Sequence, residues 1–173
     1  MNSPGVLLNE AIQHEGAWLC RRVNERMAEL LGINPAARLT TSKPSGNASV
    51  LLGTSSGVQG EHAERYIRNV QITDEQPVCE IMKRTNPYMI EKSVWSAGDT
   101  DHVISFPIIA DKNSIFKADL TGTSLMRRVL SIQKNWIEQG TVTERCVDPS
   151  VRHNVSHTVV VGPDEWNDVV HYL

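Results

Sequence analysis

One stretch of the sequence sets the expected fold, and it reads Arg38-Leu39-Thr40-Thr41-Ser42-Lys43-Pro44-Ser45-Gly46-Asn47-Ala48-Ser49-Val50-Leu51-Leu52-Gly53-Thr54-Ser55-Ser56-Gly57. Its centre, residues 43–49, contains one cation and otherwise only small, polar or backbone-shaping residues. The apolar run of residues 50–52 follows directly. This order predicts a polar loop that runs into the first turn of a short buried helix.

Such a loop has the composition of an anion site. The first backbone N–H groups of a helix lack intrahelical partners and lie at the positive end of the helix dipole. Small residues allow an anion to approach these groups, and Ser45, Asn47 and Ser49 can add side-chain donors. Pro44 fixes one φ angle, and Gly46 permits a backbone geometry that other residues resist.

The loop matches neither the P-loop motif nor the Gly-rich dinucleotide motif. A Ser/Gly surface connector is the alternative interpretation of the same residues.

The remaining chain predicts an α/β protein whose helices alternate with strands. Residues 39–42 form a strand that leads into the loop, and ligands bind at such strand ends in open sheets. Further strands are expected over 65–72 and 155–161, and a hairpin joins strands 89–95 and 103–109 through a turn at 97–101. Helices are expected from Thr73 or Asp74 to residue 84, over 121–139, and after Gly162-Pro163-Asp164.

The first helix should begin at Ser3-Pro4 and end at Gly32, and Gly16 leaves open whether it is one helix or two. Its apolar residues recur on one face, and its charged residues form the solvated face. The apolar set is Leu8, Ile12, Leu19, Val23, Met27 and Leu30, and the charged set is Arg21, Arg22, Glu25, Arg26 and Glu29. The last helix should direct Trp166, Val169, Val170 and Leu173 inward.

Composition narrows the classes of function. The chain has 173 residues, 40% hydrophobic and 21% charged, with a formal net charge of -3. These values fit a soluble globular domain and give no electrostatic case for nucleic-acid or membrane binding.

Cys20, Cys79 and Cys146 form no zinc pattern, and a reducing, cytoplasmic setting is expected. His153 and His157 straddle a strand, so no metal site is predicted.

The loop and several later blocks resemble the large chains of ribonucleotide reductases, and most closely the adenosylcobalamin-dependent (class II) branch. The loop supplies residues 40–49 and Gly53-Thr54-Ser55-Ser56-Gly57-Val58. The other blocks are Arg65-Tyr66-Ile67-Arg68-Asn69-Val70, Asn86-Pro87-Tyr88-Met89-Ile90-Glu91, Ser93-Val94-Trp95-Ser96-Ala97 and Arg152-His153-Asn154-Val155-Ser156-His157-Thr158.

The resemblance implies a partial section of a ten-stranded α/β barrel, taken as a single partial domain over residues 1–173. Ser45, Gly46, Asn47, Ala48 and Ser49 would bind the phosphates of a ribonucleoside di- or triphosphate. Asn47 stands where many of these reductases have Thr, which leaves the phosphate oxygen it meets undefined. The complete enzyme would bind adenosylcobalamin, a cobalt cofactor, and would use a dithiol reductant such as thioredoxin.

The catalytic cysteine motifs of the family precede the phosphate loop and are not found in this sequence, so no catalytic role is carried onto the three cysteines. The chain is therefore expected to be the C-terminal section of a reductase barrel, inactive without the upstream section. Two alternatives remain: a non-catalytic module that binds nucleotide phosphates, and an inert fragment.

Overall fold

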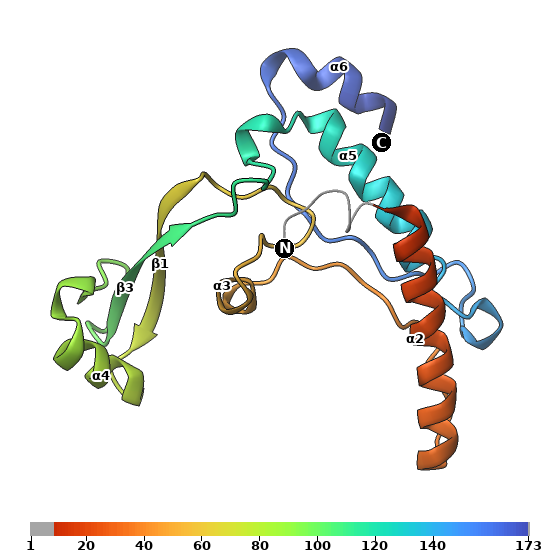
Figure 1. The fold of residues 1–173 in the computed structure, drawn as a ribbon, viewed down its shortest axis with the longest axis horizontal. Helices are drawn as coiled ribbons and strands as arrows, with labels where there is room; N and C mark the ends of the chain where they lie inside the picture. Colours follow the sequence, from red (N-terminus) through yellow and green to blue (C-terminus); the bar gives the residue numbers. More distant parts are fainter. Residues whose placement is uncertain (1–8, 173) are drawn as a thin grey trace. The chain divides into compact units, whose positions relative to one another are not determined.

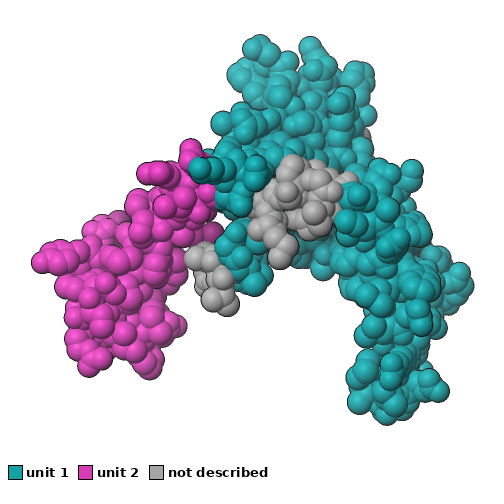
Figure 2. All heavy atoms as spheres, viewed as in Figure 1, with its two compact units in different colours: residues 1–62, 111–173 teal, residues 63–110 magenta. Residues whose placement is uncertain are grey.

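The computed structural model describes residues 9–172, apart from the side chains of Asn47, Val50 and Leu51. The chain divides into two compact units (Figure 2). Unit 1 contains residues 1–62 and 111–173, and unit 2 contains residues 63–110. The predicted helix start at Ser3-Pro4, the apolar Leu8 and the terminal Leu173 lie outside the described residues.

Unit 1 is built mainly from helices (Figure 1). Its helices are α2 (Glu10–Leu31), α3 (Asn47–Leu52), α5 (Gly122–Ile132) and α6 (Trp166–Val169). A π-helical segment, η3 (Gln133–Ile137), extends α5 and packs against α2. Short 3-10 turns complete the unit at η2 (Lys117–Asp119), η4 (Thr143–Arg145), η5 (Pro163–Glu165) and η6 (Val170–Tyr172).

Helix α2 is continuous through Gly16. A Cβ at that position would lie 3.2 Å from the ring of Trp136, so the glycine makes room for an aromatic side chain. Asn9 caps the start by accepting a hydrogen bond from the backbone N–H of Ile12, and Gly32 ends the helix with a φ of 64°. The predicted end of the helix is therefore confirmed, and Gly16 does not divide it. The helix begins at Glu10, so Ser3-Pro4 is not its start.

Unit 2 is a three-stranded antiparallel sheet with one helix. Strands β1 (Arg65–Thr73), β3 (Asp101–Ile109) and β2 (Ile90–Lys92) lie in the order β1-β3-β2, and α4 (Pro77–Thr85) and η1 (Pro87–Met89) connect β1 to β2. The core consists of Ile72, Cys79 and Ile104. The predicted hairpin is confirmed as the β2–β3 pair, although β2 is only three residues long.

Several predicted elements differ from the structure. Residues 39–42 form no regular strand, and only isolated bridges occur, at Arg38 with Thr141 and at Ser42 with Val155. The predicted strand 155–161 is likewise reduced to the bridge at Val155. A β-branched run forms a strand only where a neighbouring strand completes its ladder, and none of the described residues provides one.

Two helices also differ from their predictions. Helix α4 begins at Pro77 with Gln76 as the N-cap, so Thr73 and Asp74 do not cap it. In the last helical segment only Val169 is buried, whereas Trp166 and Val170 are exposed.

The apolar face of α2 is not covered in the described part of the chain. Ile12, Leu19, Val23, Met27 and Leu30 are all about half exposed or more, and the buried positions are Gln13, Ala17 and Ala28. The prediction of one apolar face is confirmed, but its burial is not. No helix among residues 9–172 is both long and apolar enough to span a bilayer.

Candidate functional site

The predicted phosphate loop is a closed structure in unit 1. The predicted short helix is confirmed as α3, but its burial is not, because Leu52 is 71% exposed. Gly53 and Gly57 adopt left-handed φ angles of 61° and 63° where the chain turns back. The hydroxyl of Ser56 donates to the carbonyl of Ser45 at 2.7 Å and ties the returning chain to the start of the loop. A Cβ at Gly57 would lie 3.2 Å from the backbone of Lys43 and Pro44, so the two ends are in close contact.

The segment that leads into the loop is fixed by residues far away in the sequence. The hydroxyl of Thr40 donates to the carbonyl of Trp136 at 2.6 Å, and the indole N–H of Trp136 donates to the carbonyl of Thr41 at 3.2 Å. Thr41 and Ser42 contact the segment 154–156 through the hydroxyl of Thr41 and the backbone N–H of Ser156. Two of the blocks that carry the family resemblance therefore meet at this point.

The segment that leaves the loop is held by a different part of the chain. The backbone N–H of Glu61 donates to the carbonyl of Ile115, and the backbone N–H of Lys117 donates to the carbonyl of Glu61 at 2.7 Å. The side-chain amide of Gln59 donates to the carbonyl of Thr158. Contacts on both sides thus hold the loop in one shape.

The five predicted phosphate-binding residues have different environments. Gly46 and Ala48 are exposed, Ser45 is half-buried and Ser49 is 2% exposed. The hydroxyl of Ser49 lies 3.1 Å from the carbonyl of Gly46 and 3.3 Å from that of Ser45, and it donates within the loop. The predicted side chain of Asn47 lies outside the described residues.

Gly46 does not need the freedom of a glycine for its backbone. Its φ is outside the left-handed region, and a Cβ there would meet no atom within 4 Å. The expectation of a special backbone geometry at Gly46 is therefore wrong, and Gly53 and Gly57 fill that role. Gly46 is exposed to solvent, and no protein atom lies within 4 Å of the position that a Cβ would take.

The two histidines considered for a metal site, His153 and His157, each lie close to a backbone carbonyl oxygen. Nδ1 of His153 lies 3.0 Å from the carbonyl oxygen of Thr40, and Nδ1 of His157 lies 2.9 Å from that of Val155.

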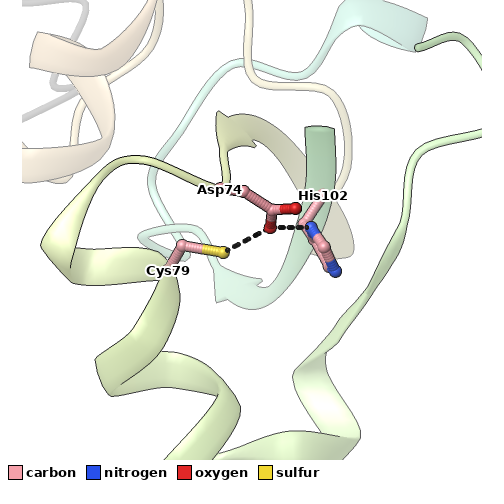
Figure 3. A group of neighbouring side chains, drawn as sticks. All are labelled: Asp74, Cys79 and His102. Carbon is pink, nitrogen blue, oxygen red and sulfur yellow. Dashed lines mark hydrogen bonds and ion pairs between the residues drawn. The ribbon is translucent and has the colours of Figure 1, made fainter. Parts of the chain in front are cut away.

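A second group of reactive side chains, which the sequence did not reveal, lies in unit 2. Asp74, Cys79 and His102 converge at the end of β1, the first turn of α4 and the start of β3 (Figure 3). The register places Ile72 opposite His102, and the backbone N–H of Asp74 donates to the carbonyl of Thr100. Strand pairing therefore brings residue 102 beside residue 74.

One carboxylate oxygen is the centre of this group. Oδ1 of Asp74 lies 2.7 Å from Nδ1 of His102, 2.9 Å from Nζ of Lys83 and 3.6 Å from Sγ of Cys79. The hydrogen bond from Lys83 holds the pKa of Asp74 below its ordinary value, and burial raises the pKa of Cys79. The thiol is therefore neutral at neutral pH and a poor nucleophile.

The comparisons with known proteins agree with the resemblance found in the sequence. No family model matches the chain. It is 24% identical over 135 residues to the adenosylcobalamin-dependent ribonucleoside-triphosphate reductase of Euglena gracilis, an alignment that covers 78% of this chain and 18% of that protein. It is 30% identical over 87 residues to the reductase of the same name from Lacticaseibacillus paracasei, which covers 50% of this chain and 11% of that protein.

A solved structure has a similar fold. The crystal structure of a B12-dependent (class II) ribonucleotide reductase matches 94% of this chain with a TM-score of 0.66 and 18% identity, over 21% of its own length. The small sheet and the helices described above thus occur together in that larger protein. The resemblance is confirmed: the chain is a relative of the adenosylcobalamin-dependent (class II) ribonucleotide reductases and spans about a fifth of their length.

Proposed function

We propose that this chain supplies the substrate-phosphate loop of a ribonucleotide reductase that converts ribonucleotides to deoxyribonucleotides by cobalamin-initiated radical chemistry. The observation that carries the proposal is the loop itself. The first turn of α3 is exposed at Gly46 and Ala48, while both flanking segments are anchored to other parts of unit 1. A fixed loop with an exposed helix start is preorganised for an anion.

Backbone groups would make the main contacts to phosphate. The amides at the start of α3 lack acceptors within the helix, and a small residue at position 48 leaves room beside them. The hydroxyl of Ser49 acts differently, because it donates to carbonyls within the loop and thereby holds the turn in shape. Lys43 is exposed and adds positive charge to the loop.

The chemical step is not assigned to this chain. Adenosylcobalamin supplies radical initiation when it is bound to a reductase of this class, and no residue of this chain is assigned to its binding site. Nδ1 of His102 is buried and lies 2.7 Å from Oδ1 of Asp74, in a cluster of small polar side chains. Cys79 is 0% exposed and cannot contact a substrate.

The remaining parts of the proposal follow from the family. The chain would form a late section of a ten-stranded α/β barrel and would require the upstream section, a ribonucleoside di- or triphosphate and a dithiol reductant. The segments at Ser42 and Val155 support this arrangement, because they share a single parallel bridge with each other and neither belongs to a strand among residues 9–172.

Isothermal titration calorimetry on the 173-residue chain tests the proposal. Wild type should bind a ribonucleoside triphosphate, and the corresponding nucleoside should bind far more weakly because it lacks phosphate. Gly46→Val should weaken triphosphate binding at least about tenfold, or roughly 1.4 kcal/mol. The valine meets no protein atom within 4 Å of its Cβ, so it would obstruct the ligand and leave the fold unchanged.

Gly98→Val is the matched control, because its Cβ would meet only Thr100 at an ordinary 3.7 Å in a turn of unit 2. This variant should bind like wild type, and circular dichroism should show that both variants are folded. Equal binding of triphosphate and nucleoside, or unchanged binding in Gly46→Val, would remove the loop from the phosphate site.

A further inference from the structure

The Asp74, Cys79 and His102 side chains form a cluster that the proposed phosphate site does not use. They project from three separate elements of unit 2, yet their ligand atoms all lie within 4.8 Å of one another (Figure 3). Cys79 is 0% exposed and His102 is 8% exposed, whereas the side chain of Asp74 is 41% exposed. The cluster is thus closed by the core on one side and open to solvent on the side of the carboxylate.

His102 shows that hydrogen bonds do not complete the cluster. Its Nδ1 is buried and lies 2.7 Å from Oδ1 of Asp74, but the ring is not oriented for a hydrogen bond, and Nδ1 has no such partner among the described residues. A buried nitrogen that meets a carboxylate without forming a hydrogen bond is uncommon in folded proteins and calls for a physical explanation. A metal ion would supply the missing partner.

The donor set fits one class of metal. An imidazole nitrogen, a thiolate and a carboxylate are the three ligand types that zinc binds in proteins. In a tetrahedral zinc site, neighbouring ligand atoms lie about 3.5 Å apart, given the usual zinc–ligand distances. Here Sγ of Cys79 lies 3.6 Å from Oδ1 of Asp74, close to that spacing. Nδ1 of His102 lies only 2.7 Å from the same oxygen, so the imidazole and the carboxylate would have to move apart to admit the ion.

Lys83 is the rival partner for the carboxylate. Its ammonium lies 2.9 Å from Oδ1 of Asp74 and forms an ion pair with it. A carboxylate has two oxygens with about four acceptor positions, so it can bind an ammonium and a metal together. With Lys83 in place, Nδ1 of His102 still forms no hydrogen bond with a described residue, so the ion pairs of Asp74 do not account for the whole cluster.

We propose that Asp74, Cys79 and His102 bind a zinc-type divalent metal ion with tetrahedral geometry, and that a solvent molecule on the side of Asp74 provides the fourth ligand. The ion joins β1, α4 and β3 and so stabilises unit 2. The proposal is independent of the phosphate loop, which lies in unit 1.

Cobalt(II) is the probe, because it replaces zinc and its spectrum reports the ligands. The full 173-residue chain is stripped with a chelator and titrated with Co²⁺. A 1:1 complex should show a sulfur-to-cobalt charge-transfer band and visible d–d bands of tetrahedral intensity, and Zn²⁺ should displace the cobalt. Cys79→Ser should abolish the charge-transfer band. His102→Asn should weaken metal binding at least about a hundredfold. Loss of a residue that only orients a metal ligand already weakens binding by up to about that factor, and His102 is a proposed ligand itself.

Two controls keep the result interpretable. Cys146→Ser removes a half-buried thiol that donates to the carbonyl of Val142, and it should leave the cobalt spectrum unchanged. Lys83→Met removes the rival cation but none of the proposed ligands, so it should tighten metal binding. Circular dichroism of each metal-free variant shows whether it is folded.

Three outcomes would overturn the proposal. The first is the lack of a charge-transfer band in folded wild-type chain at stoichiometric cobalt. The second is a band that persists in Cys79→Ser, which would place the metal on another cysteine. The third is weaker binding in folded Lys83→Met, which would show that the ion pair holds the cluster together.

Discussion

Gly46 and Gly57 lie on either side of α3 and are glycines for different reasons. Gly46 has a φ angle outside the left-handed region and open space where a Cβ would be, so the described fold does not require a glycine there. Gly57 has a φ of 63° and touches the backbone of Lys43 and Pro44, so the loop itself requires it. The structure thereby separates Gly57, which shapes the loop, from Gly46, which we propose leaves space for phosphate.

Replacing Gly57 by alanine should destabilise the folded chain by about 1–2 kcal/mol, because a Cβ is unfavourable in the left-handed region. The same Cβ would press on Lys43 and Pro44 at 3.2 Å. Urea unfolding followed by circular dichroism measures the loss. Gly46→Ala is the control and should be within about 0.5 kcal/mol of wild type. Equal stabilities of the two variants would contradict the role given to Gly57.

A third glycine fixes the segment that leads into the loop. A Cβ at Gly140 would collide with the side chain of Thr40, whose hydroxyl donates to the carbonyl of Trp136. Gly140→Ala should therefore cost about 1–3 kcal/mol, as overpacking usually does. The melting temperature should fall, whereas Gly98→Ala, which has room for its methyl group, should melt like wild type.

At the scale of elements, unit 2 is the part whose stability should depend on metal. Its core is small, with Ile72, Cys79 and Ile104 as the buried apolar residues. Zinc at a free concentration of one hundred times its dissociation constant should stabilise the folded state by about 2.7 kcal/mol. The rise in melting temperature should be reversed by a chelator and should not occur in Cys79→Ser. A rise of the same size in that variant would mean that zinc acts elsewhere.

Local patterns predicted some elements well. Helix α2 with its stop at Gly32 and the β2–β3 hairpin were correct because their signals lie within a few consecutive residues. The strand at 155–161 was wrong because its β-branched residues show only a preference, and a ladder also needs a neighbour.

The cluster of Asp74, Cys79 and His102 could not be predicted from the sequence, because its three segments meet only through the pairing of β1 with β3. Asp74 and Cys79 are five residues apart, but His102 enters from another strand.

For the phosphate loop, the sequence indicated the short helix and the small residues. It could not show that the hydroxyl of Ser49 is buried and donates within the loop.

At the scale of the whole molecule, the uncovered apolar face of α2 has a measurable consequence. Its five large apolar side chains are 46–69% exposed, and exposed apolar surface of this kind promotes association. The isolated chain should therefore associate at high concentration in sedimentation velocity. Leu19→Glu should reduce this association. Ala11→Glu adds the same charge at another exposed position and should not, and equal effects would point to charge alone.

The start of α3 is proposed to bind the phosphate of a ribonucleotide, and this binding can be observed residue by residue. The most direct measurement is an NMR titration of the backbone amides of the 173-residue chain with a ribonucleoside triphosphate and, separately, with the matching nucleoside. Phosphate binding at the start of α3 should shift the amide signals of residues 45–49 with the triphosphate and leave them in place with the nucleoside. Shifts of the same size with both ligands, or triphosphate shifts that leave residues 45–49 unaffected, would contradict it.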